Sequence, residues 1–234
     1  VQYLEDPPPE FDVVGGQAGP NDIALFLAGK PVNRGAILSR VQQTAEYQIH
    51  QKEMRFTWKA FAARRIVRIK EWSSANLPSA SVVHYPFGGP DLLHASAMFP
   101  NVSSYVLLGL EGVGELPPLE SLPPEEVLGA LPAYRQATRT QLEVGYFITK
   151  DMRSDLERSA LRGVTPILLG TIALMGGQVG SVSGISAGGK PGVQIGFSDS
   201  DGRGHRATYI SGALSNGSFA GGYESWVGSQ GRGI

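Results

Sequence analysis

Carboxylate and histidine side chains gather in one short stretch of the sequence, residues 82–112. Asp91 follows a strand-like segment, a Gly pair and a Pro, and His94 stands one helical turn later. His84 lies in the strand before them, and Glu111 follows the next strand. Such residues serve in acid–base catalysis and in metal binding. In a parallel strand–helix–strand unit the strand ends share one edge of the sheet, where these side chains can meet.

Arg65 joins this set because a helical wheel places it on the same side as Trp58 and Trp72. An arginine among tryptophans either stacks on a ring or pairs with a buried carboxylate. The catalytic hypothesis therefore names Asp91, His94, Glu111 and Arg65, with Arg65 holding an anion.

The simpler interpretation of Asp91 is structural. A carboxylate just before a helix caps free backbone amides, and this interpretation is favoured. His84 alternates with Val83 and fits an outward-facing position equally well. The residue spacing leaves the catalytic and the structural interpretations open, and the sequence specifies neither a cofactor nor a metal.

Two other motifs favour architecture over chemistry. The segment Asp199–His205, "DSDGRGH", begins like a calcium loop, but no closing acidic residue follows before Glu224, so a hairpin tip is the better interpretation. The serines of "SVSGIS" and "LSNGS" lack the strand–GxSxG–helix pattern of a hydrolase nucleophile.

A long helix, or two in near continuity, is predicted from Gly35 to about Ser74, where neither Pro nor Gly occurs. Its apolar face comprises Met54, Trp58, Phe61, Ala62, Ile66, Ile69 and Trp72. Between residues 52 and 70 it carries seven basic residues: Lys52, Arg55, Lys59, Arg64, Arg65, Arg68 and Lys70. A solvated basic face, balanced by acidic segments elsewhere, is favoured over a nucleic-acid surface.

The remaining patterns predict an α/β or α+β fold: a small sheet packed by the long helix, then a helical pair and an antiparallel meander. Strands are expected at 81–87 and 104–110, with a helix through Met98 between them. A Pro-rich linker at 115–126 precedes a helix interrupted near Pro132. The pair covers 149–177 and the meander begins at 178, ending in a Gly-rich tail without a helix. We expect one globular unit, divisible into residues 1–114 and 127–234.

Composition excludes several classes of protein. The chain of 234 residues has no cysteine, so disulfides, zinc–thiolate sites and a thiol nucleophile are excluded. A net charge of −1 provides no global field for nucleic acid or an anionic membrane, so such binding requires a local patch. No apolar run is long enough to span a membrane, and the first residues lack a signal-peptide pattern.

One segment carries a family resemblance. "YPFGGPDLLHASAMFPNVSSYVLLGLEGVGELP" resembles the signature of a bacterial family of exported, often lipoprotein-like proteins of unknown function, YPFSGPD…FP…YVLxGLEPVG. The similarity extends to "LFLAG" and to "FITKDMRSDLERSALRGVTPILLGTIALMGGQV". Gly88 replaces the usual Ser, which argues against a Ser-based role here, and Gly112 interrupts the usual Glu-Pro. Such relatives continue into a segment with paired aspartates, so we expect a chain cropped at its C-terminus.

The resemblance implies export in a bacterium and no particular reaction. We therefore expect a periplasmic or extracellular protein, membrane-anchored in its full-length form, that acts in binding or structure. A protein, a small molecule, or a second copy joined through the 178–234 meander fits as a partner. The first alternative is a hydrolase-like or metal-assisted enzyme at the "YPFGGPD" corner, and the second is a nucleic-acid binder using residues 52–70.

Overall fold

Helices and one mixed sheet make up the described chain. The computed structural model describes residues 16–86, 90–144, 160–213 and 222–231. Its helices are α1 (Pro20–Leu27), α2 (Ala36–Gln42), α3 (Ala45–Thr57), the π-helix η1 (Trp58–Ala62), α4 (Ala63–Asn76), α5 (Leu92–Met98), the 3₁₀-helix η2 (Leu119–Ser121), α6 (Pro124–Val144), α8 (Thr165–Leu174) and α10 (Gly222–Ser229). Its strands are β1 (Val82–Tyr85), β2 (Ser104–Gly109), β3 (Gln178–Ala187), β4 (Lys190–Ser198) and β5 (Gly204–Ser211).

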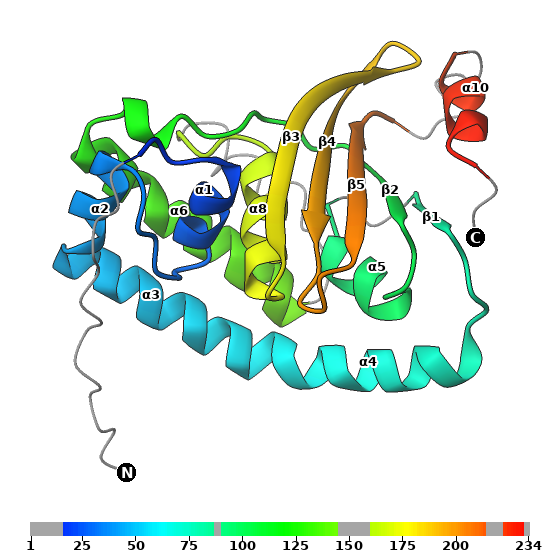
Figure 1. The fold of residues 1–234 in the computed structure, drawn as a ribbon, viewed down its shortest axis with the longest axis horizontal. Helices are drawn as coiled ribbons and strands as arrows, with labels where there is room; N and C mark the ends of the chain where they lie inside the picture. The colour runs from blue at the N-terminus through cyan, green and yellow to red at the C-terminus, as the bar shows by residue number, and fades with distance from the viewer. Residues whose placement is uncertain (1–15, 87–89, 145–159, 214–221, 232–234) are drawn as a thin grey trace.

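The five strands form one sheet in the order β1-β2-β5-β4-β3. β1, β2 and β5 are parallel, and β5, β4 and β3 are antiparallel (Figure 1). The predicted mixed α/β class and the antiparallel meander are confirmed. The sequence patterns predicted two separate sheet elements, but β5 pairs with β2 and joins them. This long-range pairing brings the carboxyl ends of β1, β2 and β5 to one edge.

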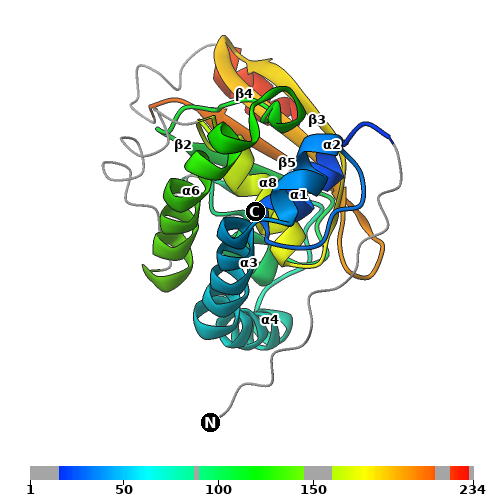
Figure 2. The same ribbon diagram turned by 90° about the vertical axis from the view of Figure 1, so that its left-hand side faces the viewer.

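Helices cover the two faces of the sheet unequally. The larger core lies between the sheet and the layer of α1, α8 and α5, and all ten residues of α8 are buried in it. A smaller apolar cluster on the opposite face holds α10 through Tyr223, Trp226 and Val227. Figure 2 shows α10 and α8 on opposite sides of the sheet.

The long helix lies one layer further out and packs on helices rather than directly on strands. Of the two predicted alternatives, one helix or two in near continuity, the structure has separate helices: Thr44 lies between α2 and α3, and its hydroxyl caps α3 by accepting from the Tyr47 N–H. Beyond it, α3, η1 and α4 run on along the side of the molecule away from the sheet (Figure 1). The hydroxyl of Tyr47 donates to the Phe26 carbonyl of α1, and that of Ser73 to the Ala97 carbonyl of α5.

A π-helical turn changes which residues of this helix are buried. Met54, Ala62 and Ile66 are buried, as predicted, but Trp72 is 57% exposed, so its predicted place on the apolar face is wrong. The π turn η1 inserts one extra residue, which rotates the following face by roughly 100°. A wheel with a constant angle per residue therefore loses its phase after Trp58.

Two other predicted features are wrong for reasons of packing. α6 passes through Pro132 without interruption, because it packs on α2 and α3, which hold it as a helix despite the missing N–H. The tail does contain a helix, α10, because Tyr223, Trp226 and Val227 recur at helical spacing and bury an apolar stripe. The first helix predicted for the 149–177 pair lies mostly outside the described residues.

The Pro-rich segment is docked on the rest of the chain. Leu119 of η2 is buried in the main core, and the carboxylate of Glu120 accepts hydrogen bonds from the Ile37 and Leu38 amides at the start of α2. A carboxylate at this position satisfies free N–H groups and complements the helix dipole. The predicted linker therefore fastens α2 to the core.

Candidate functional site

The carboxyl edge of β1, β2 and β5 carries the residues that the sequence singled out. Tyr85 ends β1, and Asp91 is the N-cap of α5. Glu111 follows β2, and Tyr209 lies near the end of β5. The strand register aligns Tyr85 with Leu107 of β2 and Leu107 with Tyr209, so both tyrosines project from the helix-covered face.

Asp91 is the centre of the first cluster at this edge. Its Oδ1 accepts from the His94 amide at 3.3 Å and from His94 Nδ1 at 2.8 Å, and its Oδ2 accepts from the Tyr85 hydroxyl at 3.3 Å. A carboxylate accepts hydrogen bonds and does not donate them, so we assign the proton of this contact to His94 Nδ1. Asp91 is 5% exposed, so it is a buried cap that also fixes two neighbouring rings.

Tyr85 titrates abnormally in this environment. Burial raises the pKa of Tyr85 to about 12, and the neighbouring charge of Asp91 adds to the effect. Its hydroxyl therefore remains a donor to the carboxylate throughout the physiological pH range.

Glu111 and Tyr209 form a separate pair. The Tyr209 hydroxyl lies 2.9 Å from the Glu111 carbonyl oxygen and 3.1 Å from its Oε2, and both residues are buried. Burial, followed by the charge of Glu111, raises the pKa of Tyr209. Tyr85 lies on β1 and Tyr209 on β5. Since β2 lies between these two strands, they are about 10 Å apart.

Arg65 lies against α6. Its guanidinium donates to the carbonyl oxygens of Leu142 at 3.0 Å and Glu143 at 3.1 Å, at the C-terminal end of that helix. A cation there satisfies free carbonyls and complements the helix dipole. Among the described residues, neither an ion pair nor a hydrogen bond joins Arg65 to Asp91.

Of the four predicted catalytic residues, the structure brings together Asp91 and His94. A carboxylate that orients an imidazole can support general-base chemistry at the other ring nitrogen. In the described part of the chain, however, no hydroxyl nucleophile is hydrogen-bonded to His94, and no group of three His, Asp or Glu side chains is placed to hold a metal. The catalytic role of Asp91, His94, Glu111 and Arg65 stays a prediction.

His84 lies on the opposite face of the sheet from Tyr85, since neighbouring strand residues point to opposite sides. Its Nδ1 is buried without a hydrogen-bond partner among the described residues.

Asp199 lies in the turn between β4 and β5 and forms a hairpin tip: its Oδ1 accepts from the Asp201 and Arg203 amides at 2.9 Å. Gly88 lies outside the described residues.

Sequence reasoning missed two buried polar side chains, His50 of α3 and Gln141 of α6. His50 is fully buried, with Nε2 3.1 Å from the Leu27 carbonyl and Nδ1 without a partner. The Gln141 amide of α6 is fully buried, and neither of its polar atoms has a partner among the described residues. The spacing of His50 four residues before Met54 places it on the core face and was the available signal.

Replacing Asp91 with alanine should lower the free energy of unfolding by about 1 to 2 kcal/mol, because α5 loses its cap and the Tyr85 hydroxyl loses its acceptor. Asp91→Asn, which keeps an acceptor, should lose less. Chemical denaturation measures both. Asp201→Ala is the control, since Asp201 makes an exposed ion pair with Arg203 that contributes at most about 1 kcal/mol. An Asp91→Ala protein as stable as the wild type would contradict the capping role.

Comparisons with protein-family models, with curated proteins and with solved structures found no match.

Proposed function

We propose that this chain is an exported bacterial protein of the cell envelope that acts by binding another protein chain rather than by catalysis. The signature around "YPFGGPD" supports export, and the free edge of β3 supports binding. The hydrogen bonds of Asp91, Arg65 and Glu111 are made to separate parts of the fold, which weighs against a shared catalytic site.

The outer edge of β3 is the observation that carries this proposal. β3 is the last strand of the sheet, ten residues long, and contains no charged residue and no proline. Natural edge strands are usually blunted by lysine, proline or short length, because an open ladder of N–H and C=O groups pairs with other chains. Asn21 protects one end, where its side chain accepts from the Val179 N–H at 2.9 Å. No residue outside the sheet that the structure describes hydrogen-bonds the backbone of residues 181–186, so this central part is open to strand addition.

The occupant we assign to this edge is β3 of a second copy, paired antiparallel about a two-fold axis. Such an interface is made of the same residues on both sides, so a charge on the strand would face its own copy. The uncharged composition removes that repulsion. Gly180, Ser181, Ser183, Gly184 and Ser186 are exposed and small, which permits close approach along the strand beyond the end that Asn21 protects.

Light scattering during size-exclusion chromatography tests this assembly over a range of protein concentrations. The wild type should form a dimer, and Ser183→Lys should shift it to monomer by placing charges at the centre of the pairing. Ser79→Lys is the matched control, because Ser79 is an exposed serine outside the sheet. A wild type that stays monomeric would disprove self-association, and a dimer unaffected by Ser183→Lys would rule out β3 as the interface.

A further inference from the structure

Exposed apolar side chains gather on the long helix. Five large hydrophobic residues in the described part of the chain are exposed, and four of them lie on α3 or α4: Ile49, Phe56, Val67 and Trp72, at 51%, 61%, 54% and 57%. Single exposed apolar residues are ordinary, but a cluster on one element marks an interaction surface. The core face of the same helix is already filled by Tyr47, Met54 and Ile66.

Unpaired cations share this surface. Six basic residues of the helix are exposed: Lys52, Arg55, Lys59, Arg64, Arg68 and Lys70. None of the six side chains forms an ion pair or a hydrogen bond with any residue that the structure describes. Neighbouring cations are engaged: Arg65 of α4 donates to α6 carbonyls, and Arg135 and Arg139 of α6 pair with Glu53 at 2.6 Å and with Glu143 at 3.2 Å. Within the part of the chain that the structure describes, the outer cations therefore have no partner.

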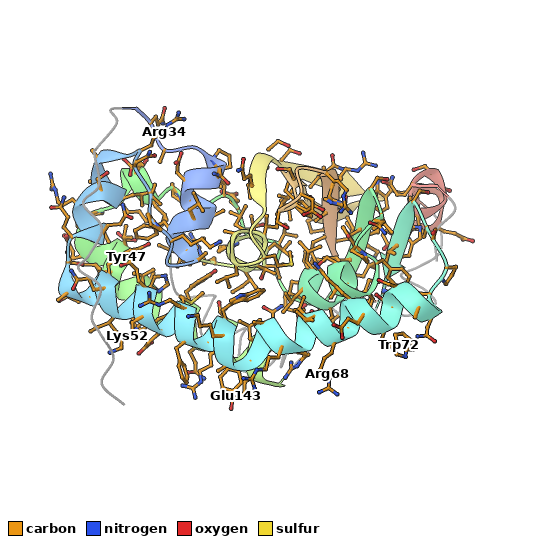
Figure 3. All side chains as sticks on the ribbon, turned by 60° about the horizontal axis from the view of Figure 1, so that its bottom comes forward. Arg34, Tyr47, Lys52, Arg68, Trp72 and Glu143 are labelled. Carbon is orange, nitrogen blue, oxygen red and sulfur yellow. The ribbon has the colours of Figure 1, made fainter. Side chains whose placement is uncertain are left out.

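The apolar and basic side chains interleave on the outer side. Ile49, Lys52 and Phe56 follow the i, i+3, i+7 spacing of one helix face. On α4, Arg64 and Arg68 are one turn apart, and Val67 lies between them. Figure 3 shows Lys52, Arg68 and Trp72 projecting from the long helix away from the rest of the molecule, whereas Tyr47 points inward. We call this surface, formed by the four exposed apolar residues and the six cations, the outer helix face.

We propose that the outer helix face docks on the surface of an anionic lipid bilayer. A helix that combines exposed Trp, Phe and aliphatic residues with Lys and Arg matches the interface between acyl chains and acidic headgroups. Residues 45–76 form one continuous rod about 48 Å long, which meets a plane along its whole length. The outer helix face is distinct from the β3 edge, so a test of bilayer binding does not depend on whether the protein dimerises.

Charge distribution supports this orientation. Residues 45–76 carry seven Lys or Arg and three Glu, although the whole chain has a net charge of −1. The remaining residues together are therefore acidic, with five more Asp and Glu than Lys and Arg. An anionic surface attracts the helix and repels the rest of the protein. A bilayer accounts for Ile49 and Val67 better than a nucleic acid, because aliphatic side chains do not stack on bases as aromatic rings do.

Co-sedimentation with vesicles tests the proposal. The full chain should bind vesicles of mixed phosphatidylcholine and phosphatidylglycerol, bind phosphatidylcholine vesicles weakly, and lose affinity as salt rises from about 0.1 M to 1 M. Phe56→Ser with Trp72→Ser should weaken binding by about tenfold or more. Each Lys or Arg of the outer helix face changed to Gln should weaken it by about fivefold at low salt.

Matched controls lie elsewhere on the surface. Leu110 is 63% exposed and Arg206 is exposed, both outside the helix, so Leu110→Ser and Arg206→Gln should bind as the wild type does. Circular dichroism confirms that each variant is folded. Equal binding to neutral and anionic vesicles, equal losses in the control variants, or no binding would overturn the proposal. Tighter binding to single- or double-stranded oligonucleotides than to vesicles would overturn it in favour of a nucleic-acid surface.

Discussion

Gly163→Ala should lower the free energy of unfolding by about 3 kcal/mol or more, a large part of the stability of an ordinary domain. Gly163 has φ +77°, a conformation that L side chains rarely adopt, and an added Cβ would collide with the amide nitrogen of Gly114 and lie 2.8 Å from the Gly112 carbonyl. These neighbours are backbone atoms, so no rotamer change relieves the contact.

The expected loss of stability is large because the close backbone contact between Gly163 and residues 112–114 holds α8 in place. The Val164 N–H donates to the carbonyls of Gly112 and Val113, and the Thr165 N–H and hydroxyl donate to the Val113 carbonyl. The helix that begins at Thr165 is buried along its entire length. Pushing the two segments apart would therefore displace the central helix of the main core.

Chemical denaturation of Gly163→Ala beside Gly112→Ala measures this effect. Gly112 has no atom within 4 Å of its added Cβ and is not in the left-handed region, so its variant should stay within about 0.5 kcal/mol of the wild type. Similar stabilities for the two variants would show that the Gly114–Gly163 contact is not as tight as described.

Acidification from pH 6.5 towards pH 4 should destabilise the protein by up to about 3 kcal/mol through His50 alone. Burial lowers the pKa of His50 to about 4, and the nearby positive charge of Arg135 adds to the effect. In the unfolded chain the imidazole takes a proton near its ordinary pKa of 6.5. Between these values the unfolded state binds the proton and the folded state does not, so stability falls as pH falls.

The surroundings of His50 do not offset this loss. Burial raises the pKa of both Tyr47 and Tyr134, whose rings contact His50, so neither hydroxyl titrates in this window. Unfolding at pH 7 and pH 4.5 should show a large difference for the wild type and a small one for His50→Gln, which keeps a donor near the Leu27 carbonyl. Equal pH dependence in both proteins would contradict the buried neutral state of His50.

Local patterns of the sequence were sufficient to predict the fold class and most of the strands and helices, although they missed α10. The alternation in β3, β4 and β5, the turns between them and the apolar run of α8 predicted the meander and a buried helix. The cap at Asp91 was also predictable, because a carboxylate just before a helix finds free amides within its own turn. Such features depend on neighbours within a few residues, whose geometry is fixed by the chain itself.

Other features depend on partners far along the chain, and the sequence alone did not specify those partners. Arg65 was placed with Trp72, but the π turn rotated α4 and Arg65 met the carbonyls of α6 instead. Glu111 was grouped with Asp91, but the parallel pairing of β5 with β2 supplied Tyr209 as its partner. Nothing in the local sequence specifies which strand becomes a neighbour of β2.

The sequence by itself determined the strands, most of the helices other than α10, and the basic composition of residues 52–70. Only the tertiary structure decided which surfaces no described residue covers: the outer edge of β3, and the outer helix face with its exposed Phe56 and Trp72. The physical reason is that exposure belongs to the packed molecule. A side chain or a strand edge is free only when no other element covers it, and that depends on every contact of the fold.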